Sequence, residues 1–78
     1  MRERSPGVEL AQRALSSREL QVLEMAAQGL TNAEIAARLA VTVHAIKFHL
    51  GSVYRKLGVS NRTEAAITLV REQQGTVI

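Results

Sequence analysis

The chain has 78 residues, 46% of them hydrophobic, with a net charge of +3 and no cysteine, a composition that supports one modest core and excludes disulfides, thiolate metal sites and a large enzyme cleft. No apolar run approaches the ~20 residues of a membrane span, and the first residues lack the apolar stretch of a signal peptide, so we expect a cytoplasmic protein.

The first helix is predicted over about residues 16–28. Residues 1–14 contain the only proline and are interpreted as a tail or a severed linker. The segment LSSREL then places Ser16 at the N-cap and Glu19 at the third helical position, which is the pattern of a capping box. Gly29 is expected to end the helix, because glycine accepts the left-handed conformation that follows many helices.

The second helix, over about residues 32–40, begins with the same pattern, in which Thr31 takes the N-cap and Glu34 the third position. Only the segment from Ala40 to Thr42 separates it from the next helix. So short a connection forces a sharp crossing and is typical of a helix-turn-helix, although a generic four-helix bundle with tight turns has the same spacing.

The third helix is predicted over about residues 43–57, from a Thr42 cap to a Gly58 stop. Apolar residues recur along one side with the helical period and are predicted to face the core: Ile46, Leu50, Val53 and Leu57. The opposite side carries no acidic residue and holds polar, basic and aromatic ones: His44, Lys47, Phe48, Gly51, Tyr54 and Arg55. An ordinary surface helix would pair Glu with Lys there, so this side is the candidate binding face.

A fourth helix follows over about residues 62–72, with Asn61 and Glu64 as its cap, and residues 74–78 are interpreted as a C-terminal tail. No strand pattern competes with these helices. The sequence therefore predicts an all-α fold, a four-helix bundle that contains a helix-turn-helix, in one domain over residues 15–73.

Charge is distributed unevenly along the chain. Residues 1–34 hold four basic and five acidic side chains, a net charge of −1, whereas residues 35–78 hold six basic and two acidic ones, a net charge of +4. Between Ile35 and Thr63 there is no acidic residue but five basic ones: Arg38, Lys47, Arg55, Lys56 and Arg62. A one-sided positive field favours polyanions such as nucleic acid, although charge alone is equally compatible with a solvated basic face.

Four segments carry a family resemblance. They contain Leu15, Ser16, Arg18 and Glu19; Gly29, Thr31, Asn32, Glu34, Ile35 and Ala36; Ile46, Lys47 and His49; and Lys56, Leu57, Gly58, Val59 and Arg62. In this order and spacing, residues 15–66 resemble the LuxR-type DNA-binding domain of bacterial transcription regulators. The resemblance implies the effector domain of a regulator, which binds double-stranded DNA sequence-specifically with helix 43–57 in the major groove. It also implies pairing with a second copy, leaves RNA polymerase as a candidate partner, and implies no cofactor.

Site residues follow from the resemblance together with the free face of the third helix. The residues predicted to contact bases are Lys47, Phe48, Gly51 and His44. The residues predicted to contact phosphates are His49, Lys56, Arg62 and Arg55, with Thr31 and Asn32 at the positive start of the second helix, where capping is already a sufficient explanation. The residues predicted to form the dimer interface are Ala65, Ala66, Leu69 and Val70.

Some of these assignments keep an alternative. Gly51 stands where relatives often carry a long side chain, so base contact there is either reduced or made by close approach of the backbone. His49 is also compatible with an ordinary histidine at the edge of the core. For the last helix the alternative is that Ala66, Leu69 and Val70 close the core over the first helix.

Two other functions fit the helices: a sigma-factor-like promoter-binding domain, and a helical module that binds protein partners through exposed apolar residues. Catalysis is not expected, because the chain lacks Asp, Cys, a Gly-rich phosphate loop and a His at nucleophile–base spacing from a Ser or Glu. His44 and His49 are five residues apart and do not share a helix face as a metal-binding pair would, so no metal site is expected. Without Asp the chain has no phospho-acceptor of the receiver type, so a signal would enter from a segment before Arg2, or the protein acts alone.

Overall fold

The computed structural model describes residues 14–75, with side chains as far as residue 73. Within this range the chain forms four helices and no strand: α2 (Ser17–Ala27), α3 (Asn32–Leu39), α4 (Val43–Leu57) and α5 (Arg62–Gly75). The predicted all-α fold is confirmed. Apart from Ala14, the predicted N-terminal tail lies outside the described residues.

The first two described helices begin at the predicted capping boxes. The Glu19 N–H donates to Ser16 Oγ at 3.1 Å, and the Ser16 N–H donates back to Glu19 Oε1 at 2.8 Å. Thr31 and Glu34 repeat both bonds at the same distances. Each box satisfies donors that a helix start would otherwise leave unpaired, which explains why these short segments start where they do.

The caps of α4 and α5 are simpler. The hydroxyl of Thr42 accepts from the Ala45 N–H at 3.0 Å, as the predicted N-cap requires. Asn61 Oδ1 accepts from the Glu64 N–H at 2.9 Å, but the Glu64 carboxylate accepts from the N–H of Ser60 at 2.7 Å. The predicted cap of α5 is therefore present, with its return bond made one residue earlier than in a capping box.

Helix ends follow the predictions except at α5. Gly29 and Gly58 have φ angles of 98° and 70°, the left-handed conformation expected of the residues that stop α2 and α4. α5 continues to Gly75, beyond the predicted end at residue 72, so the first residues of the predicted C-terminal tail are helical. The reason is that glutamine favours a helix and the first residue able to interrupt it is Gly75 itself.

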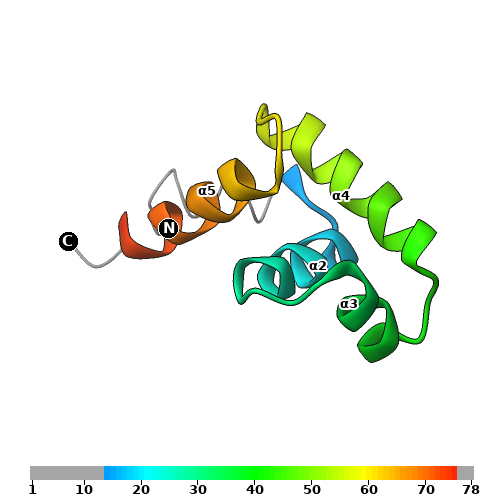
Figure 1. The fold of residues 1–78 in the computed structure, drawn as a ribbon. Coiled ribbons are helices and arrows are strands. Elements are labelled where there is room, and N and C mark those ends of the chain that lie inside the picture. The colour runs from blue at the N-terminus through cyan, green and yellow to red at the C-terminus, as the bar shows by residue number, and fades with distance from the viewer. Residues whose placement is uncertain (1–13, 76–78) are drawn as a thin grey trace.

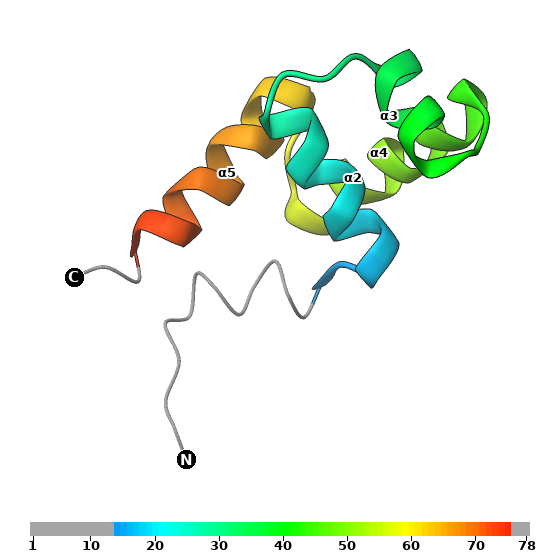
Figure 2. The same cartoon turned by 90° about the horizontal axis from the view of Figure 1, so that it is seen from below.

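The helices are arranged around α2 (Figure 1). α2 packs against both α4 and α5, and α3 packs mainly against α4. α3 and α5 lie on opposite sides of α2 in both views (Figures 1 and 2). α4 is thus supported along its length, by α3 near its start and by α5 near its end.

The core has two parts, and both draw on α2 and α4. The first joins α2, α3 and α4 through Val22, Ala26, Ile35, Ala36, Ile46 and Leu50. The second joins α2, α4 and α5 through Leu15, Leu23, Val53, Ala65 and Leu69. Half-buried Tyr54 packs against both. Burial of these side chains, worth about 1.5–3 kcal/mol for each large one, fixes the inward face of α4 and so determines which face remains outside.

The turn between α3 and α4 contains a feature that the sequence did not predict. Ala40 caps α3 with φ 57° and ψ 44°, and it is the only non-glycine residue with a positive φ among those described. The conformation brings the Val41 N–H to within 3.0 Å of the Ala36 carbonyl oxygen and turns the chain into α4. A left-handed residue with a Cβ costs roughly 1–2 kcal/mol, so the helix-turn-helix connection is strained.

We expect Ala40→Gly to raise the free energy of unfolding by about 0.5–1 kcal/mol, because glycine removes the Cβ strain at some cost in backbone entropy. Urea denaturation followed by circular dichroism measures it. The matched control is Ala37→Gly, an exposed position inside α3, which should lower the free energy of unfolding by about 1 kcal/mol. Equal destabilisation by both glycines would show that the turn is not strained.

Candidate nucleic-acid interface

The predicted binding face of α4 is exposed. Phe48 is 68% exposed, an unusual environment for a large aromatic side chain, and His44, Lys47 and Arg55 are exposed around it. Within residues 14–73, no hydrogen bond or ion pair engages the side chains of His44, Lys47 or Arg55. This face therefore offers an apolar ring, an imidazole and two cations, Lys47 and Arg55, whose donors are available to a ligand.

His49 lies at the edge of this face. Its side chain is half-buried, and its ring meets the Phe48 ring edge-on, with centroids 6.0 Å apart and planes 67° apart. Such a geometry suits the electrostatics of two aromatic rings and restrains the orientation of Phe48. The position is compatible with both predicted roles of His49, a phosphate contact and a residue at the edge of the core.

Lys56, predicted to contact phosphate, is bound to an acidic residue from another helix. Its Nζ lies 2.8 Å from Oε1 of Glu19, whose Oε2 also accepts from the Ser52 hydroxyl at 2.7 Å. The buried Glu19 carboxylate thus joins the start of α2 to the last turns of α4. The lysine side chain is still 43% exposed, and its ammonium has further donors, but the pair as a whole is neutral.

The donors around Glu19 change its acidity. Hydrogen bonds from Lys56 and Ser52 lower the pKa of the Glu19 carboxyl from 4.5 to about 2, although burial acts in the opposite direction. Because the folded pKa lies below the unfolded one, the stabilisation is complete above about pH 4.5 and is lost as the pH falls toward 2. The stabilisation is at most about 3 kcal/mol, because the Lys56 side chain is 43% exposed and water screens its charge.

We expect Glu19→Gln to lower the free energy of unfolding at neutral pH by about 2–3 kcal/mol, because glutamine keeps the capping bond but cannot pair with the ammonium of Lys56. The difference between parent and variant should shrink as the pH falls from about 5 to 2. Denaturation across this range measures it. Glu34→Gln is the control, since Glu34 makes an equivalent capping box on the exposed side of α3. A difference that does not depend on pH would contradict the ion pair.

Arg62 does not stand free for a phosphate. Its guanidinium Nη2 donates to the backbone carbonyls of Ala26, at 3.2 Å, and of Leu30. Its Nη1 donates to Asn32 Oδ1 at 3.3 Å. Arg62 therefore satisfies carbonyls near the end of α2 and ties the start of α5 to the start of α3. Arg62 and Asn32 are engaged with each other, and Thr31 is engaged in its capping box. The phosphate contacts predicted for these three residues stay predictions, and each would have to share or replace these bonds.

Tyr54 is not part of the free face. Its half-buried ring packs against both parts of the core, and burial raises the pKa of its hydroxyl, against the opposing effect of the Arg62 charge. Gly51, by contrast, is half-exposed on the same helix, between Lys47 and Arg55 along one helical line.

The predicted dimer residues divide between the core and the surface. Ala65 is fully buried and Leu69 is 5% exposed, so both side chains lie in the core, as the core-closure alternative expected of Leu69. Pairing of two copies through this helix stays a prediction. Val70 is 41% exposed and Ala66 half-buried. Ile67, which is not among the residues predicted from the sequence, is 46% exposed, and its i, i+3 spacing to Val70 is the signal that places it on the same side of the helix.

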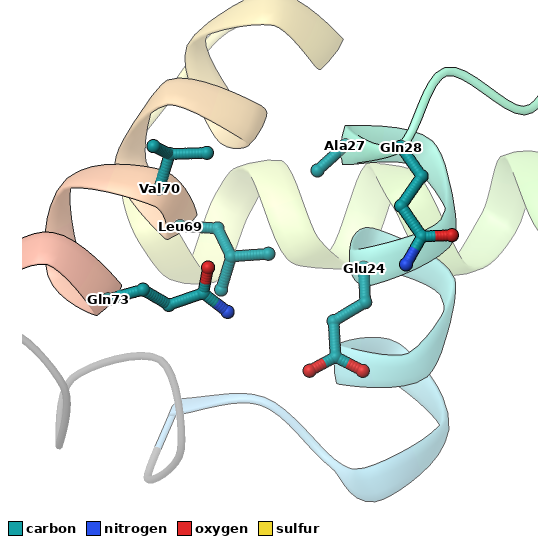
Figure 3. A pocket seen from close by; sticks show the side chains of 6 residues that line it. All are labelled: Glu24, Ala27, Gln28, Leu69, Val70 and Gln73. Carbon is teal, nitrogen blue, oxygen red and sulfur yellow. The ribbon is translucent and has the colours of Figure 1, made fainter.

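Two hollows lie beside α5. One has a volume of about 380 Å³ and is lined by α2 and α5 through Glu24, Ala27, Gln28, Leu69, Val70 and Gln73 (Figure 3). The other, of about 210 Å³, lies on the outer side of α5 and is lined by Ala66, Ile67, Val70 and Arg71. Neither is lined by any of the exposed residues of the α4 face.

Within the described part of the chain, no group of three or more His, Asp or Glu side chains is arranged to hold a metal ion. None of the described helices has the length and apolar character to cross a membrane.

Comparison with known proteins identifies relatives. The model of the family described as bacterial regulatory proteins, luxR family, matches residues 13–69. The chain is 41% identical to the transcriptional regulatory protein LiaR of Bacillus subtilis (strain 168) over 58 residues, which are 74% of the chain and 28% of LiaR. It is 44% identical over 57 residues to the putative HTH-type transcriptional regulator YhjB of Escherichia coli (strain K12), covering 73% of the chain and 28% of YhjB.

A further relative is the nitrate/nitrite response regulator protein NarP of Escherichia coli (strain K12), which is 39% identical over 59 residues, 76% of the chain and 27% of NarP. The chain thus spans little more than a quarter of the length of these curated relatives.

Proposed function

The chain belongs to the luxR family of bacterial regulatory proteins, and from this membership we propose that α4 enters the major groove of double-stranded DNA and contacts its bases. The domain acts as the DNA-binding effector of a transcription regulator. The observation that supports the placement of α4 is its outward face, where exposed Phe48 stands beside Lys47 with no acidic residue on the helix. The major groove, about 12 Å wide, admits a helix with its side chains.

The two central residues suit base edges by their chemistry. Lys47 offers an ammonium, which binds O6 and N7 of guanine, and Phe48 offers an apolar ring, which fits the methyl group of thymine. His44, in the first turn of α4, is a third candidate because the beginning of a recognition helix commonly contacts bases. His49 and the exposed part of Lys56 are proposed to contact phosphates, which position the domain without specifying sequence.

Two features reduce the number of phosphate contacts that we propose. Arg62 and Asn32 bind each other, so we assign to them the structural role of joining α5 to α3, the helices that follow and precede α4 in the chain. The charge of Lys56 is compensated by Glu19, so its contribution to salt dependence is smaller than that of a free lysine. The backbone N–H groups at the start of α3, beside Thr31, stay a candidate phosphate site.

We expect the domain to bind a selected duplex with an affinity that falls steeply with salt, at a log–log slope of about −3 per monomer for three or four phosphate contacts. Lys47→Ala should lower that affinity by about 1–3 kcal/mol and relax the preference at one base pair. Fluorescence anisotropy on a single half-site measures both. Arg71→Ala, an exposed position in the last turns of α5, is the control and should leave base preference unchanged.

A flat salt titration would reject DNA binding and favour the alternative of a protein-interaction module. Binding with an unchanged base profile in Lys47→Ala would keep DNA binding but reject base contact by Lys47.

We further propose that two copies pair on DNA through the outer side of α5. Exposed Ile67 and Val70, with Ala66 and the Arg71 stem, form an apolar surface there. Because it is small, the contact should bury well under the ~1,200 Å² of stable complexes, and pairing should occur mainly on a two-fold site. Two-fold pairing also distinguishes this function from the sigma-factor-like alternative. Contact with RNA polymerase stays a prediction from the family resemblance.

We expect Ile67→Glu and Val70→Glu to leave folding intact but to reduce the affinity for two half-sites to that for one, because a charge on the shared surface opposes pairing. Gel shifts on duplexes with one and with two half-sites measure this difference in affinity. Gln21→Glu, at an exposed position of α2, is the control for added charge. Moving the half-sites apart by half a helical turn should have the same effect in the parent. Equal parent affinities for single and double sites at every spacing would contradict pairing.

A further inference from the structure

Gly51 has no side chain on the outward face of α4, and the end of a neighbouring side chain lies beside the space that this leaves. The guanidinium Nη1 of Arg55 lies 3.9 Å from the point where a Cβ at position 51 would stand. Among the described residues, apart from the two chain neighbours of Gly51 and the local helix backbone, no other atom lies within 4 Å of that point. The side chain of Arg55 therefore runs back along the helix and holds its charged end over the glycine.

Helix geometry explains this placement. Residues four apart lie on one line along a helix, and long side chains lean toward the N-terminus over the preceding turn. A long side chain at position 51 would push the guanidinium outward, but over Gly51 it comes close to the helix surface. Its charge is displaced by about one turn, roughly 6 Å, toward the start of the helix. The guanidinium thereby comes close to Lys47 and Phe48 on the outward face of α4. These two residues and the guanidinium are called the central row.

The donors of Arg55 are available at this position. Within residues 14–73 no carboxylate pairs with its guanidinium and no hydrogen bond engages it. The next residue, Lys56, differs in each respect, because it faces α2 and is bound to Glu19. Two adjacent cations at the end of α4 thus have separate roles, one tied to the protein and one free on the outward face.

We infer that Arg55, held over Gly51, contacts a guanine in the major groove, and that the Arg55–Gly51 pair rather than the residue at position 51 alone determines the preference for one base pair. The inference rests on the proposed placement of α4 in the major groove. A planar guanidinium fits O6 and N7 of guanine with two parallel hydrogen bonds, and glycine lets the helix approach the base edges closely. It replaces the phosphate contact expected of Arg55 from the sequence.

Three variants separate this role from a phosphate contact. Arg55→Ala removes the donors. Gly51→Leu keeps every charge but fills the space left at position 51, so it displaces the guanidinium from the central row. Gly51→Ala is the matched control, because its Cβ would meet only Nη1 of Arg55 at ordinary contact distance. Circular dichroism and melting temperature establish that all three are folded, as expected for exposed or half-exposed positions.

The measurement is binding to half-site duplexes in which each base pair is varied in turn, at one fixed salt concentration. We expect the parent and Gly51→Ala to prefer guanine at one base pair that does not depend on Lys47. Arg55→Ala and Gly51→Leu should lose that preference by about 5- to 100-fold, and their double variant should lose no more than either alone. Replacing this guanine with 7-deazaguanine, which lacks the N7 acceptor, should weaken the parent but not Arg55→Ala.

Opposite results would overturn the inference without touching the proposed function. If Arg55→Ala weakens all duplexes equally and reduces the salt slope, Arg55 contacts a phosphate. If Gly51→Leu keeps the guanine preference, the absence of a side chain at position 51 is not needed for the contact between Arg55 and the guanine. Failure of the proposed function has a different outcome, in which the parent shows no salt-dependent binding and no preference at any base pair.

Discussion

The buried carboxylate of Glu19 is the contact on which the position of α4 depends. It accepts hydrogen bonds from the Ser16 N–H, from Ser52 and from Lys56, so the start of α2 and the end of α4 share one acceptor. An unpaired buried carboxylate is costly, and all its donors must therefore be in place together. The two parts of the core bury the inward face of α4 against α2, α3 and α5, and the bonds to Glu19 add to this burial in holding α4 in one rotation about its own axis. The rotation determines which side chains face outward.

How far the sequence predicts this structure depends on the distance over which each interaction acts. The caps at Ser16, Thr31 and Thr42 involve residues three positions apart, so a local pattern identifies them. The same is true of the apolar stripe of α4, which has one helical period. The bond between Lys56 and Glu19 joins positions 37 residues apart, and no local pattern contains both. For that reason the sequence predicted a phosphate contact for Lys56 without predicting its bond to Glu19.

Two further differences between the predicted and the observed structure come from tertiary packing. α5 carries apolar residues on both of its sides, with Ala65 and Leu69 turned inward and Ile67 and Val70 turned outward, so periodicity alone does not identify the buried side. The left-handed Ala40 was missed because alanine is not a residue that adopts a positive φ by preference; the tertiary contacts of α3 and α4 impose it. Tertiary packing determines both the buried side of α5 and the conformation of Ala40.

The internal use of Lys56 and Arg62 has a consequence for how such a domain searches a genome. Affinity for arbitrary DNA comes almost entirely from free cations that displace counterions, whereas affinity for the correct site adds contacts to base edges. A domain that neutralises one cation against Glu19 and uses another to bind backbone carbonyls holds arbitrary DNA less tightly. It consequently spends less time at each wrong position. Since non-specific DNA positions outnumber correct sites by many orders of magnitude, weaker non-specific binding increases the fraction of molecules found at the correct site.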